Sequence, residues 1–92
     1  MFAITFDLVV AELRASYPRR VPQAYEDINQ VLGSLGFEWV QGSVYVSRTG
    51  DLADLMRAVD ALRALPWFGT CVRDIRAFKV ENWSDFTPLF KS

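Results

Sequence analysis

The feature that most constrains the fold is an alternating apolar stretch at residues 2–8. Successive side chains of a strand point to opposite faces. One face of this stretch carries Phe2, Ile4, Phe6 and Leu8, and the other carries Ala3, Thr5 and Asp7. Because both faces are largely apolar, the pattern is typical of a central strand covered on both sides. Asp7 falls near the end of that strand, where a buried or half-buried carboxylate must be paired, hydrated or used in chemistry.

Helical periodicity follows in two segments. The first begins near Pro22, which suits the first turn of a helix, and ends at Gly36, which suits a left-handed cap. Its apolar residues recur at helical spacing, at Tyr25, Ile28, Leu32 and Leu35. The second is capped by Asp51 and stopped by Pro66. The face that we expect this helix to bury consists of Leu52, Leu55, Met56, Val59, Leu62 and Leu65.

Three more strands are predicted. Residues 37–40 and 43–47 form a pair joined by a tight turn at Gln41 and Gly42, and residues 72–80 form the last long strand. The strand pattern of residues 43–47 ends before Thr49 and Gly50, which break it. Residues 9–16 fit a loop or a short helical turn, and residues 67–69 an aromatic loop. Residues 84–90 fit a terminal helix or an edge segment that docks on a partner, with Ser84 as a candidate cap.

The order of elements is therefore β-α-β-β-α-β within a single domain spanning residues 1–92. Right-handed crossovers and a central hairpin turn this order into an α+β, ferredoxin-like fold. It has a four-stranded antiparallel sheet with two helices on one face and the first and third strands in the centre. The open face of such a sheet needs a cover, and a second copy of the chain is the simplest one. We therefore expect a homodimer.

Composition excludes several classes of site. The chain has no histidine and a single cysteine, Cys71, so Ser-His-Asp and Cys-His catalysis, an internal disulfide and a cysteine zinc site are all excluded. Catalysis would have to use carboxylates, hydroxyls, Lys, Arg or a metal held by carboxylates. The net charge of −1 is unlike that of a dedicated nucleic-acid binder. Neither a signal peptide nor a membrane span is evident, so we expect a cytoplasmic protein with no membrane partner.

Five polar residues carry the chemical information. Asp7 ends the first strand and Ser43 begins the strand expected beside it, so the two can hold a divalent cation or orient a ribose hydroxyl. Arg73 and Arg76 can neutralise phosphate. In the structural interpretation, Asp7 caps a turn, Ser43 completes the hairpin and Asp74 pairs with Arg76 or Arg14. Chemistry alone favours that interpretation, because paired acids are more often structural than catalytic.

The aromatic residues allow a second hypothesis. Phe6, Tyr45 and Phe78 can form a base-stacking platform for RNA, although core or dimer contacts account for them better. The other aromatic residues that we interpret as core or interface anchors are Trp67, Phe68, Trp83 and Phe86.

Several stretches resemble the virulence-associated protein D (VapD) family over essentially the whole chain. They are Phe6-Asp7-Leu8, Gly36-Phe37, Gln41-Gly42-Ser43-Val44-Tyr45, residues 72–78 and Trp83-Ser84-Asp85-Phe86-Thr87. The piece around Ser43 and the early acid also resemble, more weakly, the small ribonuclease-fold subunit of CRISPR spacer acquisition.

The resemblance implies a ferredoxin-like homodimer that acts as an endoribonuclease toxin on single-stranded RNA or mRNA, with a cognate antitoxin protein as its partner. It implies that Asp7, Ser43 and Asp74 are catalytic, and that Asp7 is a ligand for Mg²⁺ if a metal is used. Arg73 and Arg76 are then candidates for substrate binding. The alternatives are a non-catalytic dimeric interaction module and an RNA-binding platform that does not cleave.

Overall fold

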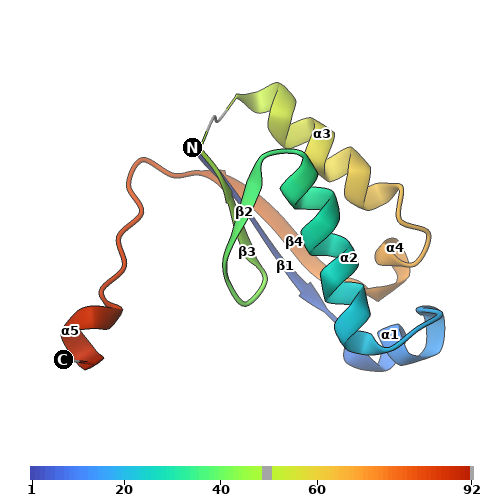
Figure 1. The fold of residues 1–92 in the computed structure, drawn as a ribbon. Helices are drawn as coiled ribbons and strands as arrows, with labels where there is room; N and C mark the ends of the chain where they lie inside the picture. The colour runs from blue at the N-terminus through green and yellow to red at the C-terminus, as the bar shows by residue number, and fades with distance from the viewer. Residues whose placement is uncertain (49–50, 92) are drawn as a thin grey trace.

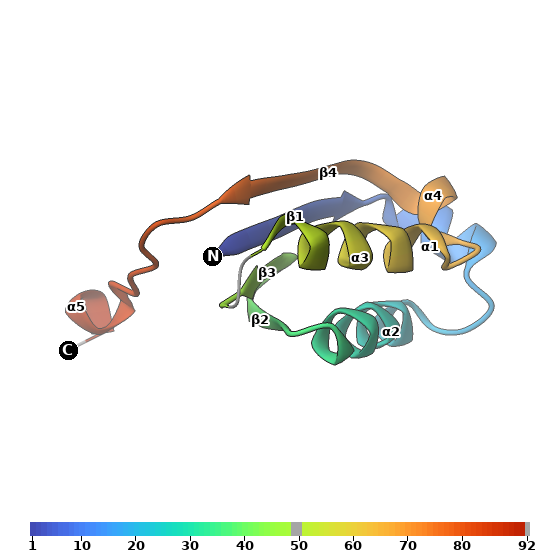
Figure 2. The ribbon, with the colours of Figure 1, turned by 90° about the horizontal axis from the view of Figure 1, so that it is seen from above.

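A computed structural model describes residues 1–48 and 51–91. The strands are β1 (Phe2–Leu8), β2 (Phe37–Gln41), β3 (Val44–Ser47) and β4 (Val72–Lys79). Within the described residues they form one four-stranded antiparallel sheet in the order β2-β3-β1-β4. Helices α2 (Val21–Ser34) and α3 (Leu52–Arg63) cover one face of this sheet (Figures 1 and 2). The predicted ferredoxin-like fold, with β1 and β3 central, is confirmed.

Three short helices complete the described chain. Helix α1 (Val10–Ser16) shows that the segment after β1 is helical, which the sequence left open. Helix α4 (Phe68–Cys71) replaces the aromatic loop predicted at residues 67–69, so that prediction is wrong. The reason is packing: Trp67 and Phe68 are buried against Tyr17 and Phe6, and the turn of helix carries them inward. Helix α5 (Thr87–Lys91) confirms a terminal helix as one of the two expected outcomes.

Local signals explain where the longer helices begin and end. Pro22 lies in the first turn of α2, and Gly36 has a φ of 87° directly after the helix. The carboxylate of Asp51 accepts a hydrogen bond from the backbone N–H of Asp54 at 2.8 Å and so caps α3. The cap predicted at Ser84 is instead provided by Asp85, whose Oδ1 accepts from the Thr87 N–H at 2.8 Å. The expected break at Thr49 and Gly50 lies outside the described residues.

The hydrophobic core lies between the sheet and the helices. Its largest fully buried apolar side chains are Phe37, Ile4, Leu13, Ile28, Leu32, Leu62 and Cys71. Burial raises the pKa of the Cys71 thiol, and the nearby Glu12 adds to the effect, so this cysteine packs as an apolar residue. The prediction that Leu52 and Met56 belong to the core is wrong, because they are 63% and 50% exposed. Helix α3 buries only the narrow stripe formed by Leu55, Ala58 and Leu62.

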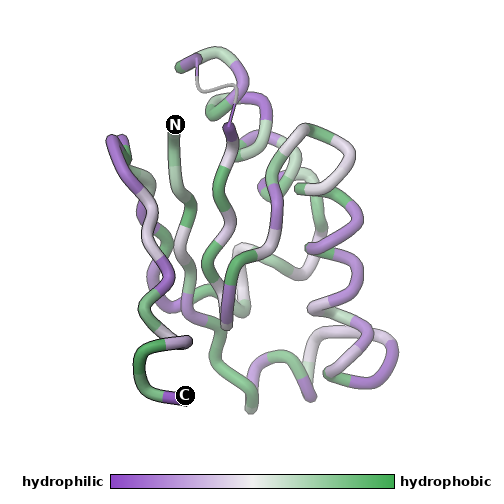
Figure 3. The backbone as a smooth tube through the Cα atoms, turned by 60° about the vertical axis from the view of Figure 1, so that its left-hand side comes forward, coloured by the Kyte–Doolittle hydropathy of each residue, from purple (hydrophilic) through white to green (hydrophobic). Residues whose placement is uncertain are grey.

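The other face of the sheet, which we call the outer face, is not covered by α2 or α3 (Figure 2). Apolar and polar residues alternate along the strands, as Figure 3 shows. Strand β4 lies at the edge of the sheet and is exposed along most of its length, which explains the charges on both of its faces. Among the described residues, no helix has the length and apolar character needed to cross a bilayer.

The chain continues beyond β4 as an extended segment that ends in α5. We call residues 81–91 the C-terminal arm. Figures 1 and 2 both show the arm leaving the edge of the sheet and standing away from the helices.

Candidate active site

Two carboxylates meet on neighbouring strands. Asp7 of β1 lies directly opposite Asp74 of β4, and Thr5 lies opposite Arg76. Opposite residues of an antiparallel pair point to the same face, with Cβ atoms about 4.5–5.5 Å apart. Because Ile4, Phe6 and Leu8 face the core, Asp7 and Asp74 share the outer face. Like charges in this arrangement repel each other, so each of them needs a compensating cation.

Two arginines compensate the negative charges of Asp7 and Asp74. The Arg73 Nη1 donates to Asp7 Oδ2 at 3.3 Å. The Arg76 Nε donates to both oxygens of Asp74, at 3.2 Å to Oδ1 and 3.0 Å to Oδ2. This hydrogen bond and the charge of Asp74 raise the pKa of the Arg76 guanidinium above its ordinary value. We call Asp7, Asp74, Arg73 and Arg76 the acid–arginine cluster.

An irregularity in the ladder explains why Arg73 reaches Asp7. Asp7 pairs with Asp74, but the next residue, Leu8, pairs with Val72. Arg73 therefore has no residue opposite it in the β1–β4 ladder. This is the pattern of a β-bulge, which redirects a side chain and is frequent beside active sites. With regular alternation Arg73 would face the side opposite Asp74. The bulge allows Arg73 and Arg76 to serve neighbouring carboxylates.

Ser43 lies beside the cluster but outside it. Its carbonyl accepts a hydrogen bond from the Phe6 N–H at 3.3 Å, which extends the β1–β3 pairing to the end of β1. The ladder therefore places Ser43 opposite Phe6 and, by alternation, on the face away from Asp7. The structure thus brings together four of the five residues predicted from the sequence.

The site is an exposed surface within one chain. The side chain of Asp7 is 58% exposed, so the expectation of a buried or half-buried carboxylate is wrong. The physical reason is that Asp7 faces the outer side, where a single chain supplies no covering layer. Asp74 pairs with Arg76, as one structural alternative predicted, and no ion pair with Arg14 is found among the described residues.

The donor set for a metal is small. Within residues 1–48 and 51–91 no group of three or more His, Cys, Asp or Glu side chains is placed to hold a metal ion. Asp7 and Asp74 provide two carboxylates. Mg²⁺ is commonly bound through one or two carboxylates together with waters and substrate phosphates. The residues therefore fit an ion shared with the substrate and do not form a complete metal cage.

Phe6, Tyr45 and Phe78 do not form the base-stacking platform that the sequence allowed as an alternative to core or dimer contacts. Phe6 and Tyr45 stack with ring centroids 6.1 Å apart inside the core. Phe78 lies opposite Ala3 on the outer face, so its ring is on the other side of the sheet. The core interpretation of Phe6 and Tyr45 is confirmed.

The other four aromatic residues divide into two pairs. Trp67 and Phe68 are buried core anchors, as predicted. Trp83 and Phe86 are exposed in the C-terminal arm.

Comparison with known proteins finds relatives that match the chain over its full length. No family model matches the chain. It is 52% identical over 92 residues to a protein of Neisseria gonorrhoeae named endoribonuclease VapD homolog, and the match covers all of both chains. It is 52% identical over 91 residues to endoribonuclease VapD of Dichelobacter nodosus, covering 99% of this chain and 98% of that protein. It is 49% identical over 94 residues to endoribonuclease VapD of Helicobacter pylori, again over the full length of both. The chain belongs to the VapD family.

Proposed function

We propose that this chain is a cytoplasmic endoribonuclease that cleaves single-stranded RNA, and that it acts as the toxin of a toxin–antitoxin pair. Its full-length relatives bear the name endoribonuclease. The observation that carries the proposal is the acid–arginine cluster, in which a bulge brings Arg73 to Asp7 beside the Asp74–Arg76 pair.

The chemistry of RNA cleavage matches this set of groups. A base must take a proton from the ribose 2′-OH or from water, and cations must stabilise the charge that develops on the phosphate. In the proposed reaction Asp7 is the base. Arginine binds phosphate with the same fork geometry that it offers to carboxylate. An RNA phosphate can therefore take Arg73 from Asp7, which frees a carboxylate oxygen to accept the proton.

The remaining candidates have supporting roles. Arg76 contacts the scissile phosphate or its neighbour, and Asp74 fixes Arg76 and adds a second carboxylate. Ser43 orients the substrate from the neighbouring strand after a local adjustment of the hairpin turn. If Mg²⁺ is used, Asp7 and Asp74 would hold it together with the RNA phosphate, and the ion would polarise the phosphate and activate water.

The proposal includes a homodimer. The cluster of a single chain lies on an open surface, which neither encloses RNA nor excludes water. A two-fold axis over the outer face would set two clusters across a shared groove. Such a groove doubles the carboxylates available to a metal and the arginines available to RNA. The antitoxin would be a separate protein that occupies this groove or blocks access to it.

A non-catalytic interaction module is the second candidate. It is supported by the ion pairs themselves, since Asp7 and Asp74 each have a cation partner in the absence of RNA. A third candidate, an RNA-binding platform without cleavage, has lost its stacking residues because Phe6 and Tyr45 are buried.

Purified protein tests these alternatives directly. Labelled single-stranded RNA is incubated with the wild type, with Asp7→Ala and with Asp60→Ala, with and without a chelator. Asp60 is a matched control, because it is also an exposed aspartate paired with an arginine, Arg63, on a distant helix. We expect cleavage by the wild type and Asp60→Ala and loss of cleavage in Asp7→Ala. RNA that stays intact with the wild type would favour the interaction module.

The toxin role has its own test. Induced expression of the wild type is expected to arrest growth of the host cells, and expression of Asp7→Ala is not. Co-expression of the neighbouring open reading frame should restore growth if it encodes the antitoxin. Unimpaired growth with active enzyme present would reject the toxin role and leave the nuclease activity standing.

A further inference from the structure

A cavity on the helix side of the sheet is lined largely by aromatic rings. It has a volume of about 270 Å³ and lies where α2 faces the tip of the β2–β3 hairpin at Gly42 (Figure 1). Its rings belong to Phe6 of β1, Tyr25 of α2, Trp39 of β2 and Tyr45 of β3. We call it the aromatic cavity. Because sites for drug-sized ligands have about 300–1,000 Å³, this volume suits a single flat heterocycle.

The rings divide into a floor and two walls. Phe6 and Tyr45 form the floor, since they are only 7% and 4% exposed. Tyr25, which is half-buried, lines the cavity from α2, and Trp39, which is 57% exposed, lines it from β2. The Trp39 Nε1 donates to the Gly42 carbonyl at 2.7 Å, which holds the indole without using its face. An exposed and fixed aromatic face is suited to stacking, because binding costs it little conformational freedom.

Two polar side chains of α2 complete the lining. Glu26 and Asn29 are both exposed, and their spacing of three residues makes them neighbours on the surface of the helix. In the part of the chain that the structure describes, neither side chain has a hydrogen bond or an ion pair. A carboxylate accepts N–H groups, and an amide both donates and accepts. Aromatic rings beside such groups are the usual means of holding an unstacked base of single-stranded RNA.

Guanine is the base whose edge matches these two groups. Its Watson–Crick edge presents two adjacent donors, N1–H and N2–H, beside the acceptor O6. The two oxygens of the Glu26 carboxylate suit the paired donors, and the Asn29 amide suits O6. Adenine and cytosine present one amino group next to an acceptor nitrogen, and uracil presents one N–H between two carbonyl oxygens. None of these three bases offers a carboxylate two adjacent N–H groups.

The aromatic cavity adjoins the acid–arginine cluster at the end of β1. Phe6 lines the cavity, and the next residue, Asp7, belongs to the cluster on the outer face. The Phe6 N–H donates to the Ser43 carbonyl, and β3 begins only at Val44, so the pairing of β1 with β3 ends at Phe6. In the described sheet, no strand lies beside Asp7 on that side. An RNA chain can therefore pass the tip of the hairpin, with a base on the helix side and its phosphate at Asp7 and Arg73.

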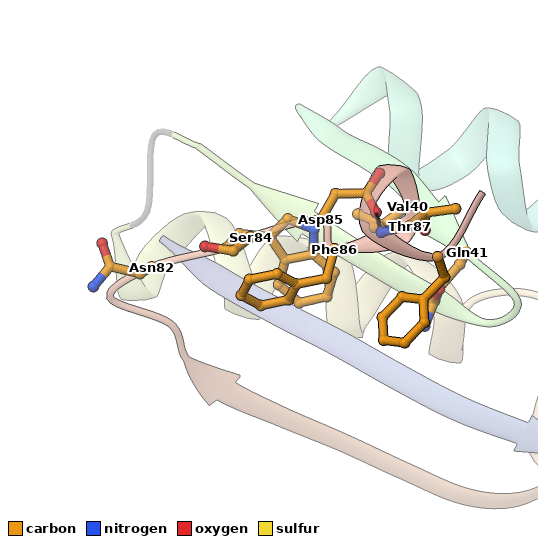
Figure 4. A pocket seen from close by; sticks show the side chains of 9 residues that line it. Val40, Gln41, Asn82, Ser84, Asp85, Phe86 and Thr87 are labelled. Atoms are coloured by element: carbon orange, nitrogen blue, oxygen red, sulfur yellow. Dashed lines mark hydrogen bonds between the residues drawn. The ribbon is translucent and has the colours of Figure 1, made fainter. Parts of the chain in front are cut away.

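A larger cavity is less suited to reading a base. It has a volume of about 870 Å³ and lies between β2 and the C-terminal arm, as Figure 4 shows. Val40 and Gln41 line one side, and arm residues that include Phe86 line the other. Its shape therefore depends on the position of an arm that stands away from the helices. The aromatic cavity is formed by three strands, the hairpin tip and α2, and precise recognition needs support from such packed elements.

We propose that the aromatic cavity binds one guanine of the RNA substrate, next to the phosphate that the acid–arginine cluster contacts. The base stacks between Tyr25 and Trp39. Glu26 accepts from its N1–H and N2–H, and Asn29 donates to O6. The cavity gives the nuclease a base preference, which the cluster alone does not provide because contacts to phosphate and sugar carry no sequence information. The inference rests on the proposed function and names the nucleotide that its substrate presents.

Binding of an uncleavable RNA analogue tests the site without relying on activity. Short labelled oligouridines carry guanine, adenine, cytosine or uracil at the central position. Their riboses are 2′-fluoro, which removes the nucleophilic hydroxyl, and a chelator is present. By fluorescence anisotropy, we expect the wild type to bind the guanine oligonucleotide roughly 5- to 100-fold more tightly than the other three, the range for a bidentate contact to a base edge. Equal binding of all four, or a preference for another base, would overturn the proposal.

Variants of the lining assign the preference to particular side chains. Glu26→Gln should remove the preference for guanine, and Asn29→Ala should reduce it. Gln30→Ala is the matched control and should keep it, because Gln30 is an exposed polar residue of the same helix that does not line the cavity. A preference that survives Glu26→Gln would refute the assignment.

The stacking wall has a separate test. Trp39→Ala should weaken the binding of the guanine oligonucleotide roughly 5- to 100-fold, the range for loss of one stacked base. Trp39→Phe keeps an aromatic face but loses the hydrogen bond to Gly42, so it should retain most of the affinity. Equal losses in the two variants would show that the turn matters and the stacking does not, which would contradict the proposed wall.

Guanosine monophosphate distinguishes an RNA site from a site for a free nucleotide. A base pocket that works together with the acid–arginine cluster should bind the guanine oligonucleotide at least about tenfold more tightly than the mononucleotide, because the linked phosphates reach the arginines at the same time. Equal affinities would indicate a site for free nucleotides and would overturn the role in RNA recognition.

These outcomes are separate from those of the nuclease test. A wild type that cleaves RNA with no preference for guanine beside the cut would reject the base site alone. A protein that binds guanine oligonucleotides through Glu26 but leaves natural RNA intact would reject the endoribonuclease activity and support the base site.

Discussion

Replacing Asp7 with Asn should abolish the proposed catalytic base and leave the stability of the fold almost unchanged. The two effects separate because Asp7 lies on an uncovered surface. The side chain of Asp7 is 58% exposed, and the side chain of its partner Arg73 is 64% exposed. No core residue contacts are lost, and Asn has nearly the same volume as Asp.

The magnitude follows from two opposing contributions. An exposed ion pair contributes about 0.2–1 kcal/mol to the free energy of unfolding, and the substitution loses it. Two like charges directly opposite each other on neighbouring strands destabilise a sheet by a similar amount, about 0.2–1 kcal/mol, and the substitution removes this repulsion between Asp7 and Asp74. The net change should be smaller than about 1 kcal/mol. In a domain of this size that corresponds to a shift in Tm of less than about 8 °C. The loss of a general base, in contrast, slows a reaction about 10²–10⁴-fold.

Urea unfolding of the wild type, Asp7→Asn and Asp60→Asn at one protein concentration measures the first effect. The fluorescence of the buried Trp67 reports the transition. RNA cleavage by the same samples measures the second. A loss of more than about 2 kcal/mol in Asp7→Asn would refute the reasoning, because surface electrostatics of this kind does not reach that value. Lost activity would then reflect unfolding.

Three further predictions concern the fold. Leu32→Ala, in the fully buried stripe of α2, should lower the free energy of unfolding by about 2–5 kcal/mol, and a smaller change measured in urea would show that the site collapses around the cavity. Gly36→Ala should lower it by roughly 1–2 kcal/mol, because the φ of 87° is strained for any residue with a Cβ. The built Cβ meets no atom within 4 Å, so a larger loss would contradict a purely backbone origin. The hydrogen bond to Asp27 raises the pKa of Tyr17 above its ordinary value of 10.0, and burial adds to the effect. The stability from this hydrogen bond is therefore fully present below pH 10.0 and is lost as the pH rises through the folded-state pKa. Tyr17→Phe should weaken the dependence of Tm on pH in that range, and an identical alkaline profile would argue against the linkage.

The sequence was sufficient for the arrangement of the main elements. Alternation at residues 2–8 and helical spacing around Ile28 and Leu62 are strong periodic signals, and Gly36, Asp51 and Pro66 mark where helices start and stop. These signals are local, so they can be interpreted without knowledge of the tertiary contacts. Helix α4 does not follow from such signals, because its four residues include Gly69 and its aromatic residue Phe68 packs against Phe6, which is distant in the sequence.

The site was predictable in residue types but not in geometry. Asp7, Asp74, Arg73 and Arg76 were identified as chemically informative, and the fold places β1 next to β4. The pairing of Asp7 with Asp74 depends on register, and the approach of Arg73 depends on a one-residue bulge. Neither follows from periodicity. Charges on both faces of residues 72–80 were the signal available for an exposed, irregular edge strand.

The exposure of Asp7 is a further feature that periodicity does not determine. Sequence patterns report which residues prefer to be buried, and they do not say what covers each face of the sheet. Helices α2 and α3 cover only the side opposite Asp7 (Figure 2), so its side chain is 58% exposed.

The cleavage rate of Asp7→Ala, set beside its affinity for the same RNA, tests the central claim most directly. Single-turnover cleavage of a labelled single-stranded RNA gives the rate, and titration of an uncleavable analogue gives the affinity. We expect a rate at least about 100-fold below that of the wild type, with RNA still bound. Equal cleavage rates for Asp7→Ala and the wild type would contradict the assignment of the acid–arginine cluster as the active site.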